Sequence, residues 1–309
     1  MAPHRPRPSL VPALHARRRL LAGTAGFALG IGSAELLSGC ASAPGEGPAH
    51  PAPWEHRLSG SAVVLLGERH DNPYHHRLRL AALERSVAAG WRPALLMEQF
   101  DTDRQADIDR ARADRPGDAS HLVAQAGRDR PGWDWEFYTP FVALALRHNL
   151  PVVAANLSRM QAQEVVRRGY VEALGAERTR ALGLDAPIAP ALQAAQEREI
   201  DIGHCRTLPA TVLAGMARSQ FARDAVMADA IARHAADGVV LLAGNGHVRR
   251  DLGVPRWLRA DLLQRAWVVG YLEPREDGGT SLYDAEVITP APPRTDPCAP
   301  LRARGSART

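Results

Sequence analysis

The sequence predicts an α/β fold, with a mostly parallel open sheet flanked by helices, an antiparallel edge and a small helical insert domain. Short apolar runs rich in β-branched residues alternate with helical segments from residue 62 onward, which is typical of parallel βαβ units. No strand pattern interrupts residues 158–208, so we expect the helical insert there. The last two apolar runs, 267–271 and 282–288, are too close together for a crossover helix, which predicts the antiparallel edge.

The first half of the alternation opens with a strand at 62–66, where alanine and valine residues precede two leucines. A helix is expected over 73–89, because it begins with a proline, which the first turn tolerates, and its apolar residues repeat at helical spacing. The second strand, 94–97, ends on Glu98. The polar segment 101–134 is expected to hold a short helix and a loop.

The second half repeats the pattern. A helix at 135–149 is followed by a strand at 151–155, in which two valines follow a proline. Glycines and prolines break the helical pattern of 158–208 at several points, and a long helix is expected over 209–236. The apolar run 239–243 then predicts a strand that lies after a helix, as in a further βαβ unit.

The start of the chain predicts export. Adjacent arginines, an apolar stretch and the sequence Leu-Ser-Gly-Cys describe a twin-arginine type signal peptide with a lipobox, in which Cys40 is lipidated. We therefore expect residues 1–39 to be a signal peptide, 40–53 a tether, 54–289 the globular domain and 290–309 a disordered tail. The expected location is the bacterial cell envelope, with the protein lipid-anchored at the outer membrane and facing the periplasm.

Charge argues against a nucleic-acid partner. The chain carries a formal net charge of +4, and residues 1–39 contain five arginines and one glutamate, which account for that excess. The remaining chain is near neutral and offers no nucleic-acid-binding motif. It also contains no lysine, which excludes Schiff-base chemistry and a P-loop.

Two cysteines remain after Cys40. In an oxidising periplasm Cys205 and Cys298 are able to pair. Because Cys298 lies in the Pro- and Arg-rich segment expected to be disordered, the sequence favours no structural disulfide.

Two copies of the pattern Gly-x-x-His, each at the end of an expected strand, predict the functional site. The first copy carries Glu68 and His70, and the second ends at His247. In open α/β sheets, ligands bind just beyond the carboxyl ends of the strands. We therefore expect the two histidines to meet at one site, together with Glu98 at the end of another strand.

Helical spacing adds further candidates. His76 continues the apolar stripe of the helix 73–89, so we expect it to face the site and His75 to face solvent. Arg223 lies on the core-facing stripe of the long helix, which also holds Val212, Met216, Met227 and Ile231. A buried arginine without an anion is costly, so Arg223 should meet Glu68, Glu98 or a ligand carboxylate.

These motifs, with Gly67-Glu68-Arg69-His70-Asp71-Asn72 and the segment 219–228, resemble the ChaN-like haem-binding lipoproteins. That family groups with the TraB/Tiki and erythromycin-esterase-like proteins, and the resemblance covers about residues 58–272. It implies a parallel-type α/β domain that binds haem at a homodimer contact, for haem or iron uptake at the envelope. It also implies a tyrosine ligand to haem, a hard oxygen donor that suits ferric iron. The tyrosines nearest the motifs are Tyr74 and Tyr138, and neither is assigned as the ligand.

The resemblance leaves an enzymatic alternative open. The Tiki-type relatives look like metal-dependent proteases, and a similar hydrolase here would use Glu68, His70 and His247 as catalytic residues. His70, His247, Glu68 and Glu98 would hold a divalent metal (Mn, Co or Zn) that acidifies a bound water. A metal-free variant would use Glu68 and a histidine as general acid and base. The residues alone do not decide whether the chain is an enzyme.

Overall fold

The computed structural model describes residues 52–127, 132–274, 282–296, 298 and 299. The predicted signal peptide, the lipobox cysteine Cys40 and nearly all of the predicted tether lie outside these residues. Within the described part, no helix is both long enough and apolar enough to cross a membrane.

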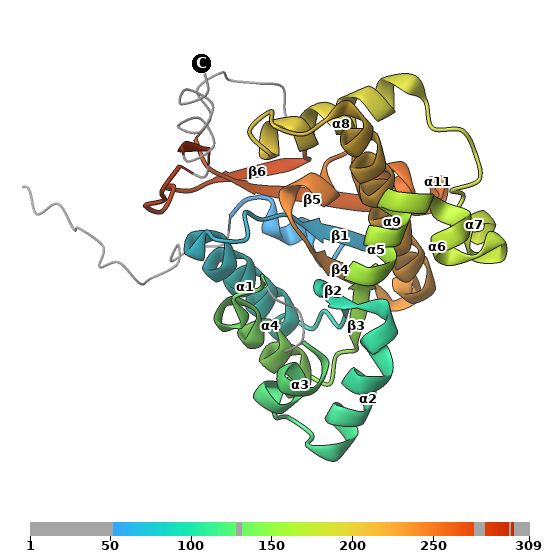
Figure 1. The fold of residues 1–309 in the computed structure, drawn as a ribbon. Coiled ribbons are helices and arrows are strands. Elements are labelled where there is room, and N and C mark those ends of the chain that lie inside the picture. The colour runs from blue at the N-terminus through green and yellow to red at the C-terminus, as the bar shows by residue number, and fades with distance from the viewer. Residues whose placement is uncertain (1–51, 128–131, 275–281, 297, 300–309) are drawn as a thin grey trace, which may run out of the picture. The chain divides into compact units, whose positions relative to one another are not determined.

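A six-stranded sheet forms the centre of the domain, in the order β3-β2-β4-β1-β5-β6 (Figure 1). Every strand pairs in parallel with its neighbours, which confirms the predicted open α/β sheet. The strands are β1 (Val63–Leu66), β2 (Ala94–Asp101), β3 (Val152–Asn156), β4 (Val239–Leu242), β5 (Ala266–Leu272) and β6 (Ala285–Ile288).

The predicted antiparallel edge is wrong, because β6 pairs with β5 in parallel. Residues 273–284 separate the two strands. A crossover between parallel strands needs about a dozen residues or more, so this connection meets the lower limit. The length of the connection therefore did not decide the direction of the edge strand.

Helices cover both faces of the sheet (Figure 1). They are α1 (Pro73–Ala88), α2 (Gln105–Asp114), α3 (Ala119–Ala126), α4 (Trp135–Arg147), α5 (Arg159–Arg168), α6 (Tyr170–Leu174), α7 (Ala176–Ala181), α8 (Pro190–Gly203), α9 (Ala210–His234), α10 (Asn245–Val248) and α11 (Ala260–Leu263). Short 3₁₀ turns lie at Glu55–Arg57, Thr102–Arg104, Ala235–Asp237 and Val254–Arg256.

The strands are apolar on both faces because each face packs against helices. Along β1, Val64 and Leu66 join the cluster formed with α1 and α4, whereas Val63 and Leu65 join the cluster formed with α9. This alternation follows from the two-residue period of a strand. Strands buried in this way read as continuous apolar runs, which explains why the sequence located them well.

The helical stretch 158–208 forms α5 to α8, as expected, and packs against the first half of α9 around a third apolar cluster. Met227 and Ile231 of α9 are fully buried, whereas Val212 near its start is 37% exposed. The stripe predicted for the long helix is therefore wrong at Val212.

The end of the described chain differs from the expected disordered tail. Cys205 and Cys298 form a disulfide, which corrects the expectation that they stay unpaired. Residues 290–296 are described, and Arg294 among them binds Asp71 and Glu273. Composition suggested disorder, but these specific contacts hold the first residues of the tail against the domain.

Candidate functional site

A cavity of about 490 Å³ lies at the carboxyl ends of the strands. Its lining includes His70 from the loop after β1, Glu98 from β2, Asn156 from β3 and His247 from α10, which follows β4. The parallel sheet delivers these side chains to one edge, as the open α/β architecture requires. The two histidines predicted to meet do line the same cavity.

Close contact at Gly244 brings the two motifs together. A Cβ atom there would lie 2.9 Å from His70 Cε1 and 3.1 Å from His70 Nε2. The backbone N–H of Gly244 donates to Glu98 Oε2 over 2.7 Å. Glycine is needed here because any side chain would occupy the space of the His70 ring. Glu98 reaches this point from an irregular part of β2, where the register with β3 shifts between Met97 and Asp101.

Glu68 fixes the orientation of the His70 ring. Its carboxylate is fully buried and accepts hydrogen bonds from Tyr138 Oη at 2.6 Å and from the Arg79 guanidinium. His70 Nδ1 lies 2.9 Å from Glu68 Oε1. Because a carboxylate accepts, Nδ1 is the donor, and the neutral ring then keeps its lone pair on Nε2. The His70 side chain is 46% exposed and lines the cavity, so its ring is accessible there.

His76 contacts Arg79, which bonds to the same carboxylate, but His76 does not line the cavity. Its Nε2 donates to the His70 carbonyl oxygen over 2.9 Å, so in the neutral ring Nδ1 accepts from Arg79 Nη2 at 3.2 Å. Burial lowers the pKa of His76 to about 4. The 3.1 Å approach of His76 Nδ1 to Glu68 is therefore not an ion pair; both groups accept from Arg79.

His247 has the opposite electrostatic surroundings. Its Nδ1 lies 2.6 Å from Asp224 Oδ1, and its Nε2 lies 3.5 Å from Glu98 Oε1. Burial alone would lower the pKa of His247, but these two carboxylates outweigh burial and raise it. Burial also raises the pKa of Asp224 to about 6. Burial alone would raise the pKa of Glu98, but the neighbouring His247 and His70 outweigh burial and lower this pKa.

Arg223 does not meet the carboxylate that the sequence analysis expected within the protein. Its Nη1 donates to Asn156 Oδ1 over 2.7 Å, and within the described part of the chain it forms no ion pair with Glu68 or Glu98. The side chain is half-buried, so water offsets part of the desolvation cost. Its guanidinium lines the cavity beside Arg159, the exposed first residue of α5.

Comparison with known proteins places the chain in a family. A family model described as "Haem-binding uptake, Tiki superfamily, ChaN" matches residues 54–258. The chain belongs to this ChaN family. The solved structure titled "Cofacial heme binding to ChaN of Campylobacter jejuni" aligns with a TM-score of 0.59 and 21% identity, covering 76% of this chain and 89% of that chain. At this identity the likeness shows a shared fold.

Two other solved structures align more distantly. The type III effector HopBA1 aligns with a TM-score of 0.41 and 14% identity, covering 76% of this chain and 91% of its own. A point mutant of the erythromycin esterase EreC, in its open conformation, aligns with a TM-score of 0.40 and 12% identity, over 70% of this chain and 71% of its own. No curated protein sequence matches the chain.

The tyrosines singled out in this ChaN-family chain do not line the cavity. Tyr138 is fully buried and donates to Glu68, and burial raises its pKa. Tyr74 is half-buried in the first turn of α1, where its ring packs under the Arg77 guanidinium. Among the described residues that line the cavity, none is a tyrosine.

The expectation for His75 was wrong. Its side chain is fully buried, its Nδ1 accepts from the backbone N–H of Arg69 over 2.9 Å, and its ring packs against Tyr271. Burial lowers the pKa of His75 to about 4. The face assigned to solvent is covered by β5, which the helix pattern alone did not reveal.

The proposed metal ligands do not gather into a metal site. Across the described residues, no group of three or more histidine, cysteine, aspartate or glutamate side chains is arranged to hold a metal ion. Glu68 already accepts hydrogen bonds at both oxygens, and both His247 nitrogens face carboxylates. The donor geometry therefore does not favour the divalent-metal alternative built on Glu68, His70, Glu98 and His247.

Three residues of the site escaped the sequence analysis. Arg79 lies three positions after His76 on the buried face of α1, so a charged residue on that stripe was a usable signal. Asp224, which orients His247, follows Arg223 directly on α9 and is 2% exposed. Trp133, whose ring meets that of His70 edge to face at 4.7 Å, lies in a polar segment that gave no signal.

Proposed function

We propose that this ChaN-family chain binds haem at the cavity between the paired motifs, and that His70 Nε2 is the protein ligand to the iron. One observation carries the proposal: a buried carboxylate fixes His70 through Nδ1, and the exposed ring lines the cavity. A histidine held through its second nitrogen by a carboxylate is the usual arrangement of a metal-ligating imidazole. Bound haem would supply a redox-active iron that accepts a protein donor atom.

Part of the remaining lining suits the carboxylates of haem, although Glu98 and Asp101 line the same cavity. Arg223 and Arg159 supply guanidinium groups that pair well with carboxylates such as the two of haem. His247 lies on the same lining, and its raised pKa favours the protonated ring, which pairs with Asp224 and Glu98. Trp133 offers an aromatic side chain beside His70. These residues bind and orient the ligand, and Glu68 keeps the proton of His70 on Nδ1.

The resemblance implied a tyrosine ligand, and the geometry supports His70 instead. Tyr138 is the tyrosine joined to the site, but its hydroxyl donates to Glu68 and lies behind His70. Binding iron through Tyr138 would break that hydrogen bond and leave part of a buried carboxylate without a partner, which is costly. His70 needs no such rearrangement.

Titration of the purified protein with haemin tests this proposal. For the wild type we expect a shifted Soret band that saturates at a single ratio of haemin to protein. For His70→Ala we expect loss of the histidine-ligated spectrum. His121→Ala is the matched control, because His121 also pairs with a carboxylate, Asp114, but lies outside the cavity. If stoichiometric haemin does not change the absorption spectrum of the wild type, the proposal is wrong. If the haemin-bound spectrum of His70→Ala equals that of the wild type, His70 is not the ligand.

We propose further that the chain serves haem or iron acquisition at the bacterial envelope, as a lipoprotein anchored through Cys40 at the outer membrane and facing the periplasm. The signal pattern and lipobox support this proposal. Fractionation of cells that express the full chain tests it. Cys40→Ser should move the protein from the membrane fraction to the soluble fraction, and an unchanged distribution would contradict lipid anchoring.

A further inference from the structure

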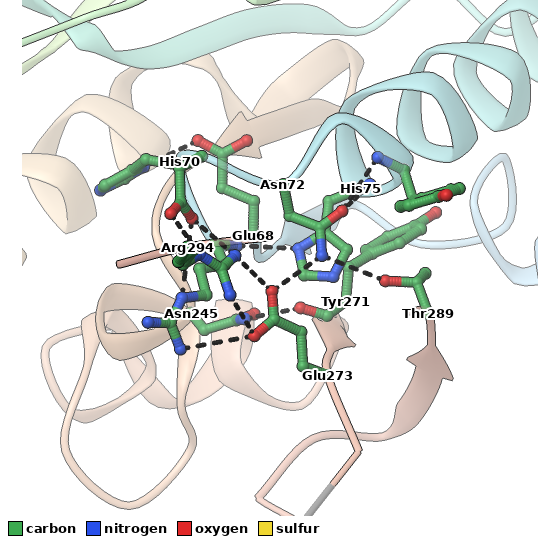
Figure 2. A network of polar contacts seen from close by, with 12 residues as sticks. Glu68, His70, Asn72, His75, Asn245, Tyr271, Glu273, Thr289 and Arg294 are labelled. Carbon is green, nitrogen blue, oxygen red and sulfur yellow. Dashed lines mark hydrogen bonds and ion pairs between the residues drawn. The ribbon is translucent and has the colours of Figure 1, made fainter. Parts of the chain in front are cut away.

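The C-terminal strap, defined as residues 289–296 with Cys298, lies against the first-motif loop, residues 67–72. Arg294 joins the two segments. Its Nη2 donates to Asp71 Oδ1 over 2.9 Å and its Nη1 donates to Glu273 Oε2 over 2.8 Å, with further bonds from the same guanidinium to both carboxylates. Figure 2 shows Arg294 reaching Glu273 beside the loop that carries His70. One arginine therefore links the residue next to His70 to the end of β5.

Asn72 connects the same loop to the strap. Its Oδ1 accepts from the backbone N–H of Tyr74 over 2.9 Å, so it caps the start of α1. Its Nδ2 donates to Glu273 Oε1 at 2.9 Å (Figure 2). It also donates to the Pro290 carbonyl oxygen at 3.0 Å. The residue that begins the helix behind His70 is thus bonded to the strap as well.

A disulfide fixes the strap at its far end. Cys298, four positions after Arg294, is bonded to Cys205 in the turn between α8 and α9. Asp71 is 56% exposed, and ion pairs to exposed groups are individually weak. They persist when a covalent link keeps the partners at high effective concentration. The disulfide therefore adds a covalent anchor to the segment that carries Arg294.

We propose that Arg294 is a positioning residue for the His70 loop, and that the Cys205–Cys298 disulfide makes ligand binding at the cavity depend on the oxidation state of these cysteines. The inference rests on the proposed haem-binding function. A dithiol reductant would break the S–S bond, deliver two electrons and two protons to form two cysteine thiols, and itself become a disulfide. The strap would then lose its covalent anchor, Arg294 would leave Asp71, and the loop that carries His70 would be held less firmly.

Two readouts test the inference without adding a reductant, which would also reduce the iron of haemin. Amide hydrogen exchange of residues 67–76 reports the loop, and haemin titration reports the site. The variants are Arg294→Ala, Arg294→Lys and the double variant Cys205→Ser with Cys298→Ser. Arg259→Ala is the matched control, since Arg259 forms an exposed pair with Asp261 away from both motifs.

We expect faster loop exchange and an affinity for haemin weaker by about fivefold or more in Arg294→Ala and in the double cysteine variant, with unchanged exchange in β4. Arg294→Lys should recover part of both effects, because lysine keeps the charge but not the planar two-carboxylate contact. The control should match the wild type.

Unchanged loop exchange in Arg294→Ala would overturn the positioning role. Faster exchange with unchanged haemin affinity would overturn the coupling to the site. If the wild type itself ignores haemin, the proposed function fails, and loop exchange alone then decides whether Arg294 positions the loop.

Discussion

The two motif histidines, His70 and His247, differ in their exposure and in the charged groups around them. His70 contacts one carboxylate through Nδ1 and is half-exposed, so it offers a lone pair to a ligand. His247 lies between two carboxylates and is 13% exposed, so its surroundings favour the protonated ring. One repeated sequence pattern thus yields a donor atom at one position and a positive charge at the other.

The raised pKa of His247 predicts a pH dependence of stability. A group whose pKa is higher in the folded state stabilises the fold fully below its unfolded value, near 6.5 for histidine, and that contribution is lost as the pH rises through the folded value. The free energy of unfolding should therefore fall above pH 6.5, with a slope of at most about 1.4 kcal/mol per pH unit for one proton. Urea denaturation between pH 6.5 and 9 measures it.

His247→Gln is the comparison for this experiment, because it removes the titrating ring and should flatten the curve over the same range. Of the carboxylates around His247, Glu98 has a lowered pKa and is ionised throughout this window, and Asp224, with a pKa of about 6, completes its titration at the lower end of the window. His75 and His76, with pKa values lowered to about 4, weaken the fold only below pH 6.5. Parallel curves for the variant and the wild type would contradict a raised pKa at His247.

At the scale of elements, the turn after β4 determines how closely the two motifs approach. Replacing Gly244 with alanine would place a Cβ atom 2.9 Å from His70 Cε1. Because the His70 ring is half-exposed, we expect it to move toward solvent and the fold to survive. Gly244→Ala should therefore weaken haemin binding about tenfold or more while the thermal midpoint changes little.

Gly246→Ala is the control in the same turn, because a Cβ atom at Gly246 would have no neighbour within 4 Å. This variant should bind haemin as the wild type does. Equal affinities for Gly244→Ala and Gly246→Ala would show that the position of the His70 ring does not govern binding.

The strands and their polar ends were predictable because buried parallel strands are continuous apolar runs and because open sheets place ligands at one edge. The sequence did not predict which way side chains point on helices that are only partly covered by other elements. His75 is buried because β5 covers it through Tyr271, and Arg223 is satisfied by an amide on β3. Both contacts join residues far apart in the chain. Local periodicity contains no information about them.

The same limit applies to the whole molecule at its C-terminal end. The composition of residues 290–309 is typical of disorder, yet Arg294 and Cys298 bind residues from distant parts of the chain. Two specific contacts outweigh a compositional tendency when each joins the segment to an ordered partner. These contacts join residues that are far apart in the sequence, so local sequence patterns do not predict them. The same separation makes the disulfide an effective crosslink.

The disulfide should stabilise the whole domain, because it closes a loop of 93 positions in the unfolded chain. Crosslinks over long loops remove much of the entropy of the unfolded state, with typical gains of about 2–4 kcal/mol. Reduction of the wild type should therefore lower the free energy of unfolding by about that amount in urea denaturation. The double variant Cys205→Ser with Cys298→Ser should resemble the reduced wild type and should not respond to reductant. Identical unfolding curves for oxidised and reduced wild type would contradict a stabilising crosslink and would leave the hydrogen bonds and ion pairs of the strap as its contacts with the domain.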